Sequence, residues 1–201
     1  MKKLLMAFAI LCSVSAMSAE PDYYAALCAW APGQLPMAKH SVIWGVRGTL
    51  FYGDHTRLNG LDLAIGANRT REEFNGLAIA GVYNYANNAN GVQWGFANIV
   101  ENEFAGFQWG SWNHARFCYG TQWGDVNTTA YFEGFQWGSI WNRVWEGYGM
   151  QWGFVNTANY FAGFQMGFLN WAHDLDGFQL GLINVVVNQP VCVLPFLNIG
   201  F

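Results

Sequence analysis

The sequence predicts an all-β protein built from tandem repeats of 14–15 residues. Three observations lead to this prediction: a Gly-x-Gln-x-Gly motif that recurs at that step, apolar and polar residues that alternate within each copy, and an unusual composition. Of the 201 residues, 53% are apolar and 18% are aromatic, whereas only 11% carry a charge. A typical soluble domain has about 25% charged residues. An ordinary, evenly charged outer surface is therefore hard to build from this chain.

The balance of charge excludes one large class of function. The chain has 9 basic and 13 acidic residues, for a formal net charge of −4. Proteins that bind nucleic acids need a positively charged patch, so no nucleic-acid partner is expected. The high apolar content likewise argues against a disordered chain, since such chains lack enough apolar surface to bury.

The first 19 residues predict a secretory signal peptide. Two lysines precede the apolar run 4–11, and small residues follow as far as position 19, which is the pattern of a bacterial export signal. Cleavage after Ala16 or after Ser18 satisfies the small-x-small rule equally. The mature chain is expected to leave the cytoplasm. Residues 20–41 form either a first strand or a lead-in, and no other stretch is long and apolar enough for a membrane helix.

The repeats lie within a single predicted β-repeat domain, residues 42–201, and nine copies cover 60–184. The first glycine of the well-formed copies lies at Gly91, Gly106, Gly120, Gly134, Gly149, Gly163 and Gly177. An asparagine follows seven positions later, or eight in one copy, at Asn98, Asn113, Asn127, Asn142, Asn156, Asn170 and Asn184. Two degenerate copies without the glutamine lie upstream, Gly60 to Asn68 with Asp62 and Gly76 to Asn84 with Ala78.

Each copy predicts one strand with two different faces, because large apolar residues alternate with glutamine at a period of two. A helix is disfavoured, since two fixed glycines per copy would each cost about 1 kcal/mol. The apolar column, three residues after the first glycine, contains Trp94, Trp109, Trp123, Trp137, Trp152, Met166 and Leu180. The glutamine column, one residue earlier, contains Gln93, Gln108, Gln122, Gln136, Gln151, Gln165 and Gln179.

Two architectures fit this pattern. The favoured one is a closed or ring-like antiparallel meander, similar to a barrel, in which each repeat is one strand and one turn. Nine residues per strand, tilted as in outer-membrane barrels, would span about 22–25 Å of apolar layer. The export signal, the scarcity of charge within the strands and a closing strand at 191–201, which ends on Phe201, favour it. The alternative is a parallel β-solenoid, in which each repeat is one coil and equal columns stack on themselves.

The repeat array resembles a known family. The Gly-x-Gln-x-Gly-x-x-Asn copies, the lead-in segments 50–53 and 60–63 and the ending 196–201 are similar to a bacterial surface-repeat family found in spirochaetes and other Gram-negative groups. The resemblance covers about residues 42–201, although tryptophan stands here where the family mostly has leucine or isoleucine. It implies a secreted or surface location and no established biochemical activity.

Cysteine and histidine offer little chemistry. After export, an odd number of cysteines remains, so Cys28 and Cys192 could form one disulfide, or all three, with Cys118, could be buried thiols. The histidines, at His40, His55, His114 and His173, are expected in solvent-exposed turns. Neither residue type shows the spacing of a metal site. The sequence therefore predicts no catalytic residue, no metal and no cofactor.

Both columns have a structural and a functional interpretation. Glutamines in register on neighbouring strands would bond one another, whereas the same row beside aromatic residues could line a groove for a glycan. One tryptophan carries about 150–250 Å² of surface, so the apolar column is expected to face either a core or lipid rather than water. As an exposed stacking platform, it would instead bind a sugar or a partner chain.

Together these observations predict a non-enzymatic, exported protein of the Gram-negative envelope. It is expected in or on the outer membrane or at the cell surface, with membrane lipid as its partner and a structural or surface-interaction role. The alternative is a soluble periplasmic or secreted binding module that holds a glycan or a protein partner with its aromatic and glutamine columns.

Overall fold

The computed structural model describes residues 22–30, 34–35 and 42–200. The predicted signal peptide at 1–19, His40 and Phe201 lie outside the described residues. The chain divides into two compact units, an N-terminal unit within Met1–Phe96 and a C-terminal unit within Ala97–Phe201.

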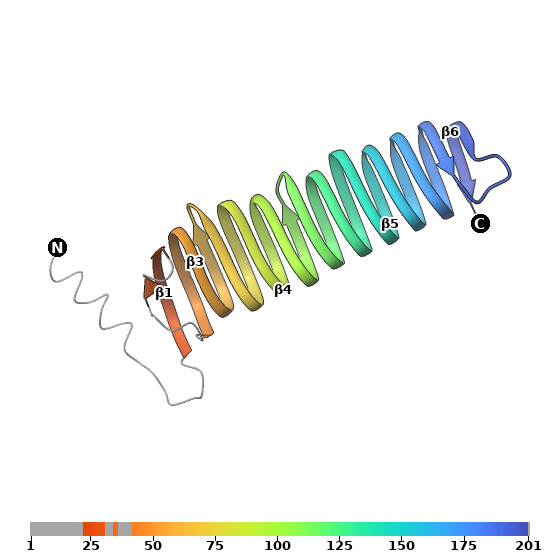
Figure 1. Ribbon diagram of the computed structural model, residues 1–201. Coiled ribbons are helices and arrows are strands. Elements are labelled where there is room, and N and C mark those ends of the chain that lie inside the picture. Colours follow the sequence, from red (N-terminus) through yellow and green to blue (C-terminus); the bar gives the residue numbers. More distant parts are fainter. Residues whose placement is uncertain (1–21, 31–33, 36–41, 201) are drawn as a thin grey trace. The chain divides into compact units, whose positions relative to one another are not determined.

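Almost every described residue belongs to a strand, so the all-β prediction is confirmed. The strands are β1 (Asp22–Trp30), β2 (Gln34–Leu35), β3 (Val42–Ala64), β4 (Ala67–Trp109), β5 (Trp112–Val186) and β6 (Val193–Gly200). A straight strand with the 75 residues of β5 would extend for about 250 Å. It winds instead through successive coils that stack on one another, as Figure 1 shows.

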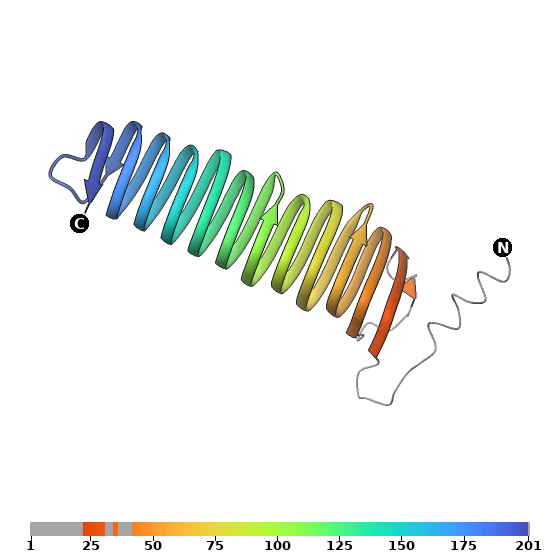
Figure 2. The ribbon, with the colours of Figure 1, turned by 180° about the vertical axis from the view of Figure 1, so that it is seen from behind.

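Neighbouring coils pair in parallel and in register. In the N-terminal unit, Gly60 of β3 pairs with Gly76 of β4. In the C-terminal unit, Gln108 of β4 pairs with Gln122 of β5, and Trp109 pairs with Trp123 in the same way. Equivalent residues of successive copies therefore lie side by side. Each unit is a parallel β-solenoid, and Figure 2 shows the same winding from behind.

The favoured prediction of a closed antiparallel meander is thus wrong, and the parallel solenoid is the architecture. The repeat step and the alternation of residue types fit both arrangements. The parallel stack differs in placing each buried amide directly beside the same amide of the next coil. Each amide in such a row donates one hydrogen bond to one neighbour and accepts one from the other. The parallel order therefore satisfies the polar groups that the alternation places inside.

The first glycine of each motif forms a corner of its coil. These glycines have φ angles between +118° and +146°, which side chains with a Cβ rarely adopt. A Cβ on Gly134 would lie 2.0 Å from the carbonyl oxygen of Gly120 in the preceding coil. The corner column contains Gly45, Gly60, Gly76, Gly91, Gly106, Gly120, Gly134, Gly149, Gly163 and Gly177. It therefore begins at Gly45, one coil earlier than the sequence predicted.

The interior of each coil contains four columns of side chains. Two are the glutamine and asparagine columns, and a third, two residues after the asparagine, is mostly small, with Ala115, Ala158 and Ala172 in the C-terminal unit. The fourth, two residues before the corner glycine, is apolar: Ile43, Leu58, Phe74, Ala89, Phe104, Cys118, Phe132, Phe161 and Leu175 are all buried. Gly147 stands in this column in one coil, where Phe161 from the next coil fills its space.

Separate short strands flank the coils. At the N-terminal end, β1 pairs in parallel with β3, so part of the region 20–41 does form a first strand. At the C-terminal end, β6 turns back and pairs antiparallel with the last coil of β5, with Leu180 opposite Leu197. Pro195 and the positive φ of Phe196 (68°) interrupt the regular backbone of β6. Such features discourage further strand pairing at a sheet edge.

The structure contains no disulfide between Cys28 and Cys192, because both side chains are thiols. Cys28 is buried, and its thiol donates to the carbonyl oxygen of Tyr52 at 3.0 Å. Cys192 is exposed beside the turn that precedes β6, with Sγ 3.3 Å from the carbonyl oxygen of Gln189. Cys118 lies fully buried in the inner column two residues before the corner glycine, and this burial raises the pKa of its thiol to about 12.

Candidate functional site

The glutamine column forms a hydrogen-bonded ladder inside the solenoid. In the C-terminal unit, each glutamine donates from Nε2 to Oε1 of the glutamine in the preceding coil, at 2.7–2.8 Å, from Gln122 bonded to Gln108 as far as Gln179 bonded to Gln165. All seven glutamines have at most 1% of their surface exposed. They do not line an outer groove, and the glycan interpretation of this column has no support in the geometry.

The asparagine column forms a second ladder. Each Nδ2 from Asn98 to Asn170 donates to Oδ1 of the asparagine in the following coil at 2.8–2.9 Å. The same nitrogen also donates to a backbone carbonyl of the outward tryptophan column, as Asn127 does to Trp137 and Asn142 does to Trp152, both at 2.9 Å. The two ladders run in opposite directions along the chain, so their amide dipoles oppose one another.

In the first coils of the N-terminal unit, a buried ion pair takes the place of the glutamine ladder. Arg47 and Asp62 each lie two residues after a corner glycine, so they occupy the inner column that holds glutamine elsewhere. Nε of Arg47 donates to Oδ1 of Asp62 at 2.7 Å, and Nη2 donates to Oδ2. Nη1 lies 3.0 Å from Nδ1 of His55 and also donates to the carbonyl oxygen of Arg69 at 3.1 Å. All three ionisable side chains are almost completely buried.

Sequence reasoning missed this cluster. His55 was expected in an exposed turn, but it lies fully buried in β3. Arg47 lies outside the predicted repeats, which begin at Gly60. Placing one more copy at Gly45 would have shown opposite charges in adjacent coils of the same inner column.

Burial and the neighbouring Arg47 guanidinium lower the pKa of His55 from 6.5 to about 3. The imidazole is therefore neutral near pH 7, with Nδ1 accepting a hydrogen bond from Arg47. Among the residues that the structure describes, Nε2 of His55 has no hydrogen-bond partner. This site is closed to solvent, so a change in the protonation of His55 acts on the stability of the N-terminal unit.

A dependence of stability on pH follows from His55. Between pH 6.5 and about pH 3, the unfolded chain binds a proton at this imidazole and the folded chain does not. The contribution of the neutral imidazole to the free energy of unfolding is therefore fully present above pH 6.5. It falls as the pH is lowered, by up to about 1.4 kcal/mol per pH unit. Urea unfolding followed at pH 7 and pH 4.5 should show a smaller loss in His55→Asn than in the parent chain. An equal loss in the two chains would contradict the assignment.

The remaining described histidines lie in β5 and are half-buried rather than in exposed turns. Nδ1 of His114 is 2.9 Å from Oγ1 of Thr128, and Nδ1 of His173 is 2.9 Å from a carboxylate oxygen of Asp174. Burial lowers the pKa of His114. Within the described ranges, no three His, Cys, Asp or Glu side chains come together as metal ligands would.

The outward side of the motif strands forms the candidate site. We call it the motif face: the outward residues one, three and five positions after each corner glycine of the C-terminal unit. The face includes Trp109, Trp123 and Trp152, each at least 40% exposed, so the tryptophan column faces outward. Its members are Phe107, Trp109, Ser111, Thr121, Trp123, Asp125, Phe135, Trp137, Ser139, Met150, Trp152, Phe154, Phe164, Met166, Phe168, Phe178, Leu180 and Leu182. Asp125 is its one charged residue.

The motif face is a row of contacting side chains. The rings of Trp123 and Trp137 pack edge to face at 4.3 Å, and those of Phe154 and Phe168 stack at 4.9 Å. Leu197 and Ile199 of β6 pair opposite Leu180 and Phe178 and are exposed as well, so β6 adds to the apolar surface.

The other side of the C-terminal coils carries the charge. We call it the linker face: the outward residues between each asparagine and the next corner glycine. Its charged residues are Glu101, Glu103, Arg116, Glu133, Arg143, Glu146, Asp174 and Asp176. A row of tyrosine rings also crosses it, with centroids 5.6–5.9 Å apart, from Tyr119 through Tyr131 and Tyr148 to Tyr160. The hydroxyl of Tyr148 donates to Glu146 at 2.6 Å, and this bond raises the pKa of Tyr148 to about 12.

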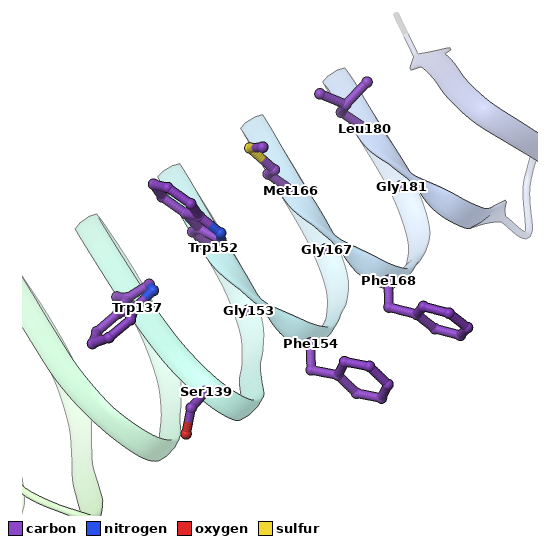
Figure 3. A pocket seen from close by; sticks show the side chains of 10 residues that line it. All are labelled: Trp137, Ser139, Trp152, Gly153, Phe154, Met166, Gly167, Phe168, Leu180 and Gly181. Carbon is purple, nitrogen blue, oxygen red and sulfur yellow. The ribbon is translucent and has the colours of Figure 1, made fainter.

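A shallow, open groove of about 510 Å³ runs across several coils of the motif face. Figure 3 shows its two walls as parallel rows of side chains. One wall contains Trp137, Trp152, Met166 and Leu180, and the other contains Ser139, Phe154 and Phe168. Gly153, Gly167 and Gly181 lie between the two walls. The groove is straight because the same column positions repeat in register from coil to coil.

Comparisons with family models, curated proteins and solved structures found no match for this chain. Across the part of the chain that the structure describes, there is no helix with the length and apolar character needed to cross a membrane.

Proposed function

We propose that this chain is a non-enzymatic, exported protein of the Gram-negative envelope that attaches to outer-membrane lipid through its motif face. The observation that carries the proposal is the segregation of charge around the C-terminal coils. Eight charged residues lie on the linker face, whereas the motif face has one and exposes many large apolar side chains. Surfaces of this kind mark sites of contact with a membrane or another protein.

The energetics favour burial of the motif face in an apolar phase. About half of the surface of each exposed tryptophan is in contact with solvent. Removing that area from water contributes about 2–3 kcal/mol per tryptophan as an upper estimate. Several such residues act together because they lie in one column. Amphipathic surfaces attach to membranes in the same way, with the apolar side at the acyl boundary and the charged side in water.

The predicted export signal directs the protein to the compartment where this lipid lies, and the resemblance to surface-repeat proteins agrees with that location. A structural role suits the interior, since its buried ionisable groups, Arg47, Asp62 and His55, are closed to substrates. The protein would then act as a rigid, lipid-bound element of the envelope.

The test combines fractionation with vesicle flotation. The chain, expressed with its own signal peptide in a Gram-negative host, should be recovered with the outer membrane. The purified protein should float with phosphatidylcholine vesicles. Changing Trp109 and Trp152 to serine should reduce flotation at least tenfold. The matched control, Trp145 and Trp171 to serine, removes two exposed tryptophans of the linker face and should leave flotation unchanged.

Recovery of the protein in the osmotic-shock fluid, together with failure to float, would contradict the proposal. The second candidate, a soluble binding module, would then lead. The row of tyrosine rings on the linker face favours that candidate, since a row of neighbouring, partly exposed rings suits a sugar or a partner chain.

A further inference from the structure

The groove is a concave part of the motif face, bounded on two sides by side chains. Its walls are two continuous rows, and Phe154 and Phe168 on one of them are stacked with an interplanar angle of only 12°. Between the rows lies bare backbone (Figure 3). The residue between the two wall positions faces the interior, since a Cβ on Gly153 would meet Nδ2 of the buried Asn142 at 2.7 Å. A straight trough with apolar walls and a bare floor suits a linear apolar occupant better than a flat or branched one.

The length of the groove matches one acyl chain. Coils of a parallel sheet are about 4.8 Å apart, so the three steps from Trp137 to Leu180 extend for about 14 Å. Half of the hydrocarbon core of a bilayer, which is the depth that one acyl chain covers, is about 15 Å. The walls carry no charged side chain among the described residues, so the part of the ligand that lies between them must be uncharged.

One end of the groove is polar. Ser139 belongs to the groove wall, and its Oγ donates to Oδ1 of Asp125 in the preceding coil at 2.5 Å. Asp125 is the one charged residue of the motif face, and it lies in the same column as Ser139, Phe154 and Phe168. A carboxylate in this place attracts a cationic head group and repels an anionic one.

We propose that the groove holds a single acyl or alkyl chain whose ammonium-bearing head group lies at Asp125, with the chain running past Ser139 between the two apolar walls. The inference rests on the proposed function, because it names which lipid the motif face selects. Ethanolamine and choline head groups carry the required ammonium, whereas a free fatty acid has the wrong charge.

Binding of dodecyltrimethylammonium and of dodecanoate tests the proposal, with both probes used below their critical micelle concentrations. Titration calorimetry on the full mature chain, with circular dichroism to verify that it stays folded, should show one site per chain. The ammonium probe should bind at least tenfold more tightly than the carboxylate probe. Asp125→Asn should reduce this ratio to less than twofold.

Phe168→Ala removes part of one wall and should weaken the binding of both probes at least fivefold. The matched control, Trp145→Ala, removes an aromatic residue that is 65% exposed on the linker face and should change neither affinity. Equal affinities for the two probes in the parent chain, or an unchanged ratio in Asp125→Asn, would overturn the proposal. So would unchanged binding in Phe168→Ala.

The two proposals fail in different ways. A protein that floats with vesicles but binds neither probe would overturn the acyl groove and leave membrane attachment in place. A protein that binds the ammonium probe but neither floats nor reaches the outer membrane would overturn membrane attachment. The groove would then be the site of a soluble lipid-binding protein.

Discussion

Gly134→Ala is expected to destabilise the C-terminal unit by about 2–6 kcal/mol, from two physical causes. The φ of Gly134 is +138°, and holding a residue with a Cβ there costs about 1–3 kcal/mol. The new Cβ would also lie 2.0 Å from the carbonyl oxygen of Gly120. That oxygen belongs to the backbone of the preceding coil, so the overlap is relieved only by separating two coils, at a cost of about 1–3 kcal/mol more. Urea unfolding followed by tryptophan fluorescence measures the loss.

Gly48→Ala is the control for this substitution. Its φ lies outside the positive range, and an added Cβ would meet only Cδ2 of Leu27, at 3.2 Å. That atom is the far end of a flexible side chain, so a change below about 1 kcal/mol is expected. A Gly134→Ala chain as stable as the control would show that the corner glycines are not required for the coil.

Asp62→Ala is expected to destabilise the N-terminal unit by about 3–5 kcal/mol. The substitution leaves the guanidinium of Arg47 buried without the carboxylate that accepts two of its hydrogen bonds. The double variant Arg47→Met, Asp62→Leu removes both charges and should lose less than half as much. Hydrogen exchange of residues 42–96 during urea titration measures the effect in this unit.

Asp62→Asn adds an intermediate case, because an amide accepts one hydrogen bond from Arg47 without balancing its charge. The expected order of stability is parent, then the double variant, then Asp62→Asn, then Asp62→Ala. A double variant less stable than Asp62→Ala would contradict the view that an unpaired buried charge, rather than lost packing, dominates the cost.

The candidate site was only partly predictable. The alternation in each copy showed that tryptophan and glutamine lie on opposite faces of one strand, but a period of two does not say which face is inside. The size of tryptophan suggested a core or lipid, and the structure places the column outside. The amides lie inside because each has an identical partner one coil away, as Gln122 has in Gln108. A single copy, taken alone, does not reveal that partner.

The groove could not be predicted at all. It depends on the third and fifth positions after the corner glycine lying in straight rows with glycines between them (Figure 3). Those rows exist only when the coils stack in parallel. In the antiparallel order that the sequence favoured, neighbouring copies would run in reverse, and Phe154 and Phe168 would not stack.

The strand content, the step of 14–15 residues and the identity of each column follow from the sequence alone. These properties depend on residues close together in the chain, where alternation and glycine act locally. The folded chain adds the parallel order of the coils, the internal position of the amides and the pairing of Arg47 with Asp62. Each of these depends on hydrogen bonds between residues about one coil apart. The local pattern is the same for either strand order, and only the stacked coils show which groups meet.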